Sequence, residues 1–189
     1  MRKVPFVSGE FYHIYNRGVE KRDISMESSD LERFFESMEL FNTFNPIGSI
    51  YEHAFVEPSL KTVKQKLVNI ICYCINPNHY HMMLQPLADD GISEFMKRLG
   101  GGYTNYFNNK YKRSGALFQG KFKAIHVDSN EHLLRLSAYI NLNNKVHRLK
   151  GDNYLSSWRE YTEENYQELC SSSILLQQFN RKKEYKAFA

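Results

Sequence analysis

Residues 76–85, with the sequence NPNHYHMMLQ, contain two histidines, His79 and His81, that are separated by one residue. On a β-strand, alternate residues point to the same face, so the two imidazoles would lie side by side and Tyr80 would point away. Neutral imidazole binds several divalent cations. Short pairs of this kind also occur as ordinary packed histidines. The pair alone therefore leaves both a metal site and a structural role open.

A tyrosine and an asparagine follow in the segment 128–147, which is predicted to be helical. His132, Leu136, Tyr139 and Asn143 recur every three or four residues along one stripe. Tyrosine is a weak nucleophile at neutral pH because its pKa is about 10, but a nearby cation would make a phosphorus atom easier to attack. From the residues alone, a tyrosine that simply packs on a sheet is the competing interpretation.

The elements that would position these residues can be read from periodicity and turn signals. The predicted order is a strand at 11–18, a helix at 28–42, an irregular insertion at 43–66 with a short helix from Ser59, and strands at 67–75 and 79–87. A helix at 91–111 follows, interrupted by three glycines that suggest a bend or the close approach of another backbone. An edge strand or extended segment at 116–127 and a helix at 128–147 complete the order. Asp128 or Ser129 is expected to cap the last helix, and Glu131 to complete a box with Asp128. This order predicts an α+β, ferredoxin-like split βαβ fold with a central antiparallel sheet and a C-terminal helix that carries Tyr139. That fold supports many functions, so only the site can indicate the function.

Composition and charge limit the classes of protein to consider. The chain has 189 residues, enough for one core, and a net charge of +4, which is compatible with a polyanionic partner. Three cysteines without a paired spacing predict a reducing, cytoplasmic location. We expect no signal peptide at the start and no membrane span, because no run approaches 18 apolar residues. His13, His53, His126 and His147 are expected to be structural or exposed.

Basic and aromatic residues are interleaved between positions 97 and 123. Such a mixture could bind the phosphates and stack on the bases of single-stranded DNA, or it could be a solvated helix face above an aromatic core. The candidate DNA-binding residues are Arg17, Lys97, Arg98, Tyr103, Lys110, Lys112, Arg113, Lys121 and Lys123.

Four stretches in the right order resemble the single-tyrosine HUH transposases, that is, the insertion sequence 200/605-like family and its relatives, the REP-associated tyrosine transposases. The stretches are YHIYNRGVEKRDI (12–24), YCINPNHYHMMLQ (73–85), GGYTNYFNNKYKRSGALFQGKFKAIHV (101–127) and LLRLSAYINLNN (133–144). The second resembles the HUH strand of the family, and the last its catalytic helix. Asn144 stands where the family usually has proline, which could shift Asn143.

The resemblance implies a function and roles for single residues. His79 and His81 would be metal ligands, Asn143 would be a third ligand, and Tyr139 would be the nucleophile. The implied cofactor is Mg²⁺ or Mn²⁺, and the implied partner is single-stranded DNA with hairpins. The enzyme would nick and rejoin DNA through a 5′-phosphotyrosine intermediate.

Several points stay open at the level of sequence. A domesticated hairpin-binding protein without strand transfer is one alternative, and an unrelated metal hydrolase with a water nucleophile is another. The family includes homodimers in which one subunit's tyrosine helix completes the other's site, as well as monomers that act in cis. The expected organisation is a catalytic domain at 1–149 and a C-terminal extension at 150–189 that packs on it.

Overall fold

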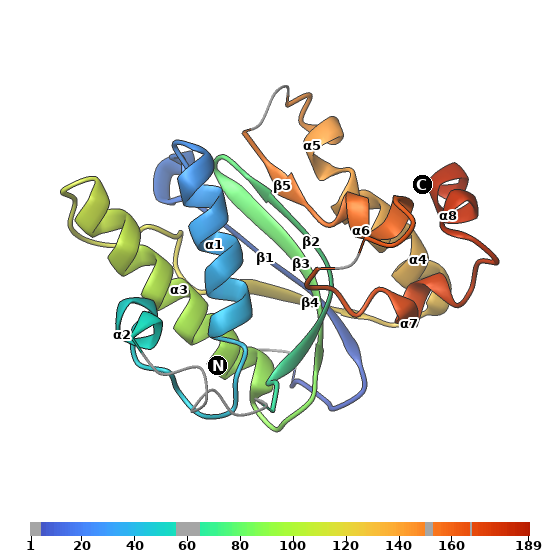
Figure 1. The fold of residues 1–189 in the computed structure, drawn as a ribbon, viewed down its shortest axis with the longest axis horizontal. Helices are drawn as coiled ribbons and strands as arrows, with labels where there is room; N and C mark the ends of the chain where they lie inside the picture. The colour runs from blue at the N-terminus through green and yellow to red at the C-terminus, as the bar shows by residue number, and fades with distance from the viewer. Residues whose placement is uncertain (1–4, 56–64, 150–152, 167) are drawn as a thin grey trace.

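The computed structural model describes residues 5–55, 65–149, 153–166 and 168–189. A five-stranded antiparallel sheet forms the centre, with helices on both of its faces (Figure 1). The strands are β1 (Phe11–Arg17), β2 (Val68–Asn76), β3 (His79–Pro86), β4 (Lys123–Val127) and β5 (Leu155–Ser156). Their spatial order is β4-β1-β3-β2-β5. The predicted α+β fold with a central antiparallel sheet is therefore confirmed.

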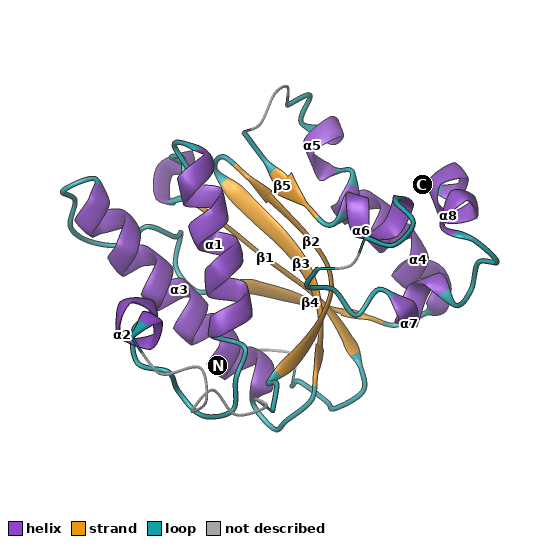
Figure 2. Ribbon diagram, in the orientation of Figure 1, coloured by secondary structure: helices purple, strands orange, loops and turns teal. Residues whose placement is uncertain are grey.

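Figure 2 shows the helices in purple on either side of the orange strands. They are η1 (Val19–Lys21), α1 (Ser28–Leu40), α2 (Ile50–Ala54), α3 (Gly91–Lys110), α4 (Asn130–Asn141), α5 (Asn143–Val146), α6 (Trp158–Thr162), α7 (Ser173–Leu176) and α8 (Lys182–Phe188). Helices α1 and α3 cover one face of the sheet, and α4 with the C-terminal helices covers the other (Figure 1).

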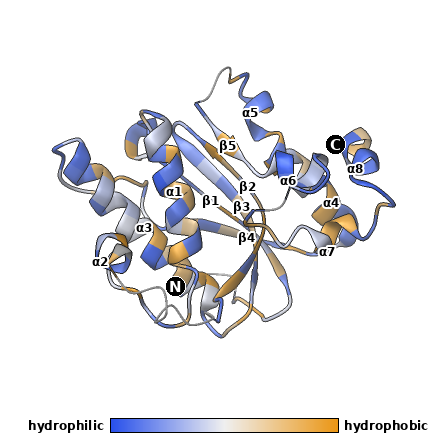
Figure 3. Ribbon diagram, viewed as in Figure 1, coloured by the Kyte–Doolittle hydropathy of each residue, from blue (hydrophilic) through white to orange (hydrophobic). Residues whose placement is uncertain are grey.

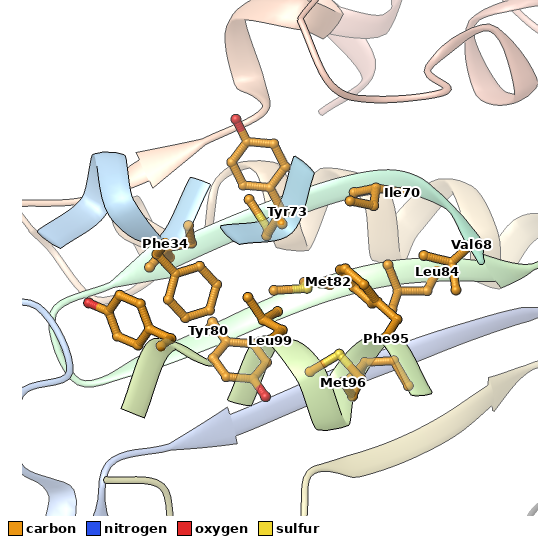
Figure 4. Packing of buried hydrophobic residues seen from close by; sticks show 14 of the residues in the cluster. Phe34, Val68, Ile70, Tyr73, Tyr80, Met82, Leu84, Phe95, Met96 and Leu99 are labelled. Carbon is orange, nitrogen blue, oxygen red and sulfur yellow. The ribbon is translucent and has the colours of Figure 1, made fainter. Parts of the chain in front are cut away.

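The first core lies between the sheet and the pair α1 and α3. Phe34 of α1 and Phe95 of α3 are fully buried against side chains of β3, among them Tyr80 and Met82 (Figure 4). Both helices alternate hydrophilic and hydrophobic residues along their length (Figure 3), as expected for helices with one buried face. This core fixes which residues of β3 remain for the opposite face, because side chains alternate along a strand.

The second core lies on that opposite face. Met83 of β3 packs there with Leu136 and Ile140 of α4, and with Tyr161 and Tyr185 from the C-terminal segment. The Tyr161 hydroxyl donates to the Ile71 carbonyl at 2.7 Å. Residues beyond position 153 are thus part of the packing beneath α4.

Three expectations about the helices were wrong. Helix α3 runs continuously through Gly100–Gly102. A Cβ on Gly102 would lie 2.5 Å from the Phe41 ring, so a side chain rather than another backbone makes the close approach. The segment 128–147 forms two helices, α4 and α5, instead of one, and Leu142 lies between them.

The third concerns the box expected at the start of α4, whereas the cap itself is one of the two residues expected. Ser129 is the cap and accepts the His132 amide at 3.2 Å. The Asp128 carboxylate instead contacts the His132 ring, and Glu131 pairs with Arg135. No box with Asp128 therefore forms.

Two further differences concern the loops. The extended segment 116–127 is a strand only from Lys123, and that strand lies at the sheet edge as expected. The insertion contains the short helix α2, whereas the helix expected from Ser59 lies outside the described residues. Within the described part of the chain, no helix is both long and apolar enough to cross a membrane.

Candidate active site

The two histidines of β3 face helix α4. Tyr80, between them, is 3 % exposed and belongs to the core under α1 and α3. The register of the sheet places Arg17 of β1 opposite His79, and Tyr15 opposite His81. Alternation along paired strands thus brings two imidazoles, a phenol and a guanidinium to one face.

A cleft of about 580 Å³ opens over these side chains. Its lining comes from β1, η1, the turn before β3, β3 itself, the loop before β4, the start of β4, α4 and the residue that follows α5. The lining residues are Tyr15, Asn16, Arg17, Lys21, Asn78, His79, His81, Gln119, Lys123, Tyr139 and His147. Two residues expected to be metal ligands and the expected nucleophile therefore share one cavity with three basic side chains.

His79 is held at both ring nitrogens. Its Nδ1 lies 2.6 Å from the Asn78 Oδ1 atom, and its Nε2 lies 2.9 Å from Asn76 Nδ2 and 3.1 Å from Asn143 Oδ1. Because Asn78 presents an acceptor and Asn76 a donor, these bonds fit a neutral ring that carries its proton on Nδ1. The Nε2 lone pair then accepts the Asn76 N–H beside the Asn143 oxygen, to which Asn76 Nδ2 also donates at 2.7 Å. Burial lowers the pKa of His79, which favours the neutral form.

His81 is held by a third histidine, His13 of β1. The distance from His81 Nδ1 to His13 Nε2 is 2.8 Å, and the two rings are nearly parallel. Burial is the main cause that lowers the pKa of His81 to about 3 and that of His13 to about 4. Both rings are therefore neutral near pH 7, the form of imidazole that binds metal ions.

Tyr139 stands edge-on over His81, with ring centroids 5.6 Å apart and an interplanar angle of 81°. It lies on α4 and its side chain is 40 % exposed, unlike Leu136 and Ile140 of the same helix, which are buried on the sheet. The helix thus places its apolar residues underneath and leaves the phenol at the cleft.

A buried network of hydrogen bonds holds α4 on the sheet. The Tyr185 hydroxyl bonds Ser137 Oγ and Asn141 Nδ2, each at 3.0 Å. Ser157 Oγ donates to Asn141 Oδ1 at 2.6 Å and also receives the backbone N–H of Tyr73 on β2. These contacts link the helix that carries Tyr139 to the central sheet of its own chain.

The family model described as "Transposase IS200 like" matches residues 50–143, a segment that contains both histidines of β3, Tyr139 and Asn143. The chain belongs to the IS200-like transposase family. Its fold is similar to a solved structure described as "Structure of the REP associates tyrosine transposase bound to a REP hairpin". The TM-score is 0.60 and the identity 10 %, over 89 % of this chain and 88 % of the other. No curated protein matches.

In this IS200-like transposase, some of the expected DNA-binding residues lie around cavities. Arg17 and Lys123 line the cleft, where Arg17 Nε donates to Gln119 and the Lys123 ammonium lies 5.9 Å from the Tyr15 ring centroid. Lys97 and Lys121 line a second groove of about 420 Å³ on the other side of the sheet, next to Gly100 and Gly101 of α3. Lys112 is exposed beyond the end of α3.

Other expected DNA-binding residues serve the fold. Tyr103 is fully buried and donates to the Ile24 carbonyl at 2.6 Å, so its ring is not accessible to a base. Lys110 bonds Asp30, a fully buried carboxylate, at 2.7 Å. The positive charge of Lys110 is therefore paired with a carboxylate of the protein itself.

The remaining two cations are also engaged with the protein. Arg98 pairs with Glu94 at 2.8 Å and donates to the Thr43 carbonyl. Arg113 lies over the Phe107 ring. The basic residues interleaved with aromatic residues in the sequence are therefore of two kinds: some line cavities or the surface, and others bind groups within the protein.

Sequence reasoning missed several residues of this transposase site. His13 and His147 were expected to be structural or exposed. His13 is buried and contacts His81, whereas His147 is exposed, as expected, and packs on His79 with centroids 4.5 Å apart. Lys21 also lines the cleft. The alternation of β1 around His13 was the available signal. This alternation shows that His13 shares a face of the sheet with His81 only when the pairing of β1 with β3 is known.

Proposed function

We propose that this transposase is a metal-dependent DNA strand transferase that nicks and rejoins single-stranded DNA through a 5′-phosphotyrosine on Tyr139. The observation that carries the proposal is the position of Tyr139 over His81, at a centroid distance of 5.6 Å, in a basic cleft that also holds His79. A pure binding protein has no need for a phenol and two neutral imidazoles at one point.

The donor set is suited to Mg²⁺ or Mn²⁺. His79 Nε2 and Asn143 Oδ1 are 3.1 Å apart, and the Asn76 Nδ2 group lies 2.9 Å from the first and 2.7 Å from the second, so it donates to both acceptors. A cation bound by these two acceptors would take the place of the Asn76 N–H groups. Imidazole together with amide oxygen is a plausible set for these ions, and His81 would complete it. Among the described residues, no cluster of three or more His, Cys, Asp or Glu offers a metal site. The proposed set therefore depends on the amide of Asn143.

The residues of the chain divide the reaction between them. When bound, the cation offsets negative charge on the scissile phosphate. The Tyr139 oxygen attacks phosphorus, the bond from phosphorus to the 3′ oxygen breaks, Tyr139 gives up a proton and the 3′ oxygen gains one. The 5′ phosphate stays on Tyr139, and a 3′ hydroxyl of another strand can reverse the step. No ATP is required, because the phosphotyrosine conserves the bond energy.

The substrate is proposed to be single-stranded DNA with a hairpin. Arg17, Lys21 and Lys123 surround the cleft and could neutralise phosphates of the strand on either side of the scissile bond. The structural relative is described as bound to a REP hairpin, which supports a hairpin near the cleaved end.

A denaturing gel tests the proposal. Purified protein is incubated with labelled single-stranded hairpin DNA, with and without Mn²⁺, and covalent adducts are resolved in denaturant. Wild type should give a metal-dependent adduct, and Tyr139→Phe should give none because it lacks the attacking oxygen. Tyr51→Phe is the matched control, since Tyr51 is an exposed tyrosine of α2, which packs near α3 on the other side of the sheet.

Two other outcomes would point to other functions. Cleavage that persists in Tyr139→Phe would indicate a hydrolase with a water nucleophile. Tight hairpin binding without cleavage or adduct, across a varied pool of hairpins, would indicate a domesticated binding protein.

A further inference from the structure

His13 is a buried histidine next to the site, with 8 % of its surface exposed. It lies on β1 and reaches diagonally across to His81 of β3, so that its Nε2 is 2.8 Å from His81 Nδ1. It does not line the cleft itself, which places it behind His81 as seen from the cavity.

A hydrogen bond between two neutral imidazoles has a direction. If His81 donates from Nδ1, its Nε2 keeps a lone pair and can bind a cation. If His13 donates instead, His81 must carry its proton on Nε2 and cannot be a ligand through that atom. The bond with His13 therefore decides whether His81 is available.

The neighbouring ligand candidate is held in the same way. His79 Nδ1 lies 2.6 Å from the oxygen of Asn78, which fixes that ring with its Nε2 toward Asn143. Histidines that bind metals generally donate their other N–H to a protein acceptor, and this outer contact sets the tautomer and the orientation of the ring. Asn78 supplies the acceptor for His79, and His13 is the group placed to supply it for His81.

We propose that His13 is a positioning residue whose Nε2 accepts the Nδ1–H of His81 and thereby presents the His81 Nε2 lone pair to the cleft. The inference rests on the proposed function, because it takes His81 as a ligand. His13 does not touch substrate or metal, and it acts only through His81.

Mn²⁺ binding, measured by calorimetry and by the electron paramagnetic resonance of free Mn²⁺, tests this role without DNA. His13→Leu removes the acceptor and should weaken binding about 10–100-fold. His13→Gln should restore most of the affinity, because its Oε1 can accept the same N–H. His126→Leu is the control, since His126 faces the other side of the sheet and pairs with Glu10. It should bind as wild type does.

A second readout concerns the metal-free protein. Nitrogen-15 NMR of the His81 ring should show the proton on Nδ1 in wild type and in His13→Gln. In His13→Leu the Nε2–H form should appear. A wild-type His81 that carries its proton only on Nε2 would overturn the inference, even if His13→Leu failed to fold.

The failures of the two proposals can be told apart. Wild-type affinity in His13→Leu would overturn the role of His13 and leave the proposed function standing. Equal losses in the Leu and Gln variants would also overturn it, because packing alone would then explain them. A wild type that binds no Mn²⁺ and forms no adduct would overturn the proposed function itself, and the inference with it.

Discussion

At the scale of single residues, Arg17 and Arg98 carry the same charge in very different surroundings. Arg17 lines the cleft and its side-chain partner is the neutral amide of Gln119. Arg98 is paired with Glu94 and donates to backbone carbonyls. Only the first is placed to exchange its partner for a phosphate, because Arg98 would have to give up a carboxylate and two backbone carbonyls.

We therefore expect Arg17→Gln to change DNA binding and Arg98→Gln to change stability. Arg17→Gln should weaken binding of single-stranded DNA and reduce the slope of log affinity against log salt by about 0.7, the value for one lost phosphate contact. Arg98→Gln should leave that slope unchanged and lower the melting temperature. Fluorescence anisotropy at several salt concentrations and thermal unfolding would measure both. An unchanged slope for Arg17→Gln would remove Arg17 from the DNA contacts.

At the scale of elements, helix α3 shows how packing can override a local signal. Three consecutive glycines predict an interruption, yet the helix is continuous from Gly91 to Lys110. Gly102 faces the ring of Phe41, which is buried at the end of α1, whereas Gly101 has open space around its Cβ position. One glycine is thus required for close packing of α1 on α3, and its neighbour is not.

Alanine at these two positions should act in opposite directions. Gly101→Ala should stabilise the protein by about 1 kcal/mol, because alanine costs less entropy in a helix. Gly102→Ala should destabilise it by about 1–3 kcal/mol, because the new Cβ would lie 2.5 Å from the Phe41 ring. Urea unfolding with a common slope would measure both changes. Equal effects of the two variants would contradict this account of the packing.

At the scale of the whole molecule, the segment after position 153 joins the helix that carries Tyr139 to the sheet. Tyr185, Asn141 and Ser157 form one buried hydrogen-bonded network between α8, α4 and the backbone of β2. We infer that residues 150–189 belong to the same domain as residues 1–149. We also infer that Tyr139 works on the histidines of its own chain, since an exchange between subunits would have to break this network.

Mixing two inactive variants tests action in cis. His79→Ala/His81→Ala lacks the proposed ligands, and Tyr139→Phe lacks the proposed nucleophile. An equimolar mixture should form no adduct with hairpin DNA, because each chain lacks one half of its own site. Activity that appears only in the mixture would show that the tyrosine helix is shared between subunits. Wild type diluted with either variant serves as the control for inhibition.

Stability should depend on pH through the buried histidines. Burial lowers the pKa of His13 to about 4 and of His81 to about 3, while both would titrate near 6.5 in the unfolded chain. Between these values the unfolded state binds protons that the folded state does not, so stability present above pH 6.5 is lost as the pH falls toward 4.

The expected loss between pH 7 and pH 4 is on the order of 3 kcal/mol for each of the two rings if they titrate independently. Urea unfolding at half-unit steps of pH, without metal, would measure it. A free energy of unfolding that stayed flat between pH 6.5 and 4.5, above the range in which most carboxylates titrate, would contradict the burial of these rings.

The sequence by itself determined the order of strands and helices, the fold class and the family resemblance. Periodicity, turn residues and the HxH spacing are local signals, and local signals specify elements and the face to which each residue points. Together with the family resemblance, they selected His79, His81, Tyr139 and Asn143 as candidates. The structure places His79 beside both His81 and Asn143, and Tyr139 over His81.

Only the tertiary structure decided which other residues contact these four candidates and line the cleft. The pairing of β1 with β3 brought His13 to His81, and the break at Leu142 did not prevent Asn143 from reaching His79. Of two candidate DNA-binding residues, Tyr103 is buried in the core, whereas Lys123 lines the cleft. The reason is physical: a charge or an aromatic ring acts according to its partners and its exposure. Contacts between residues far apart in the chain set both.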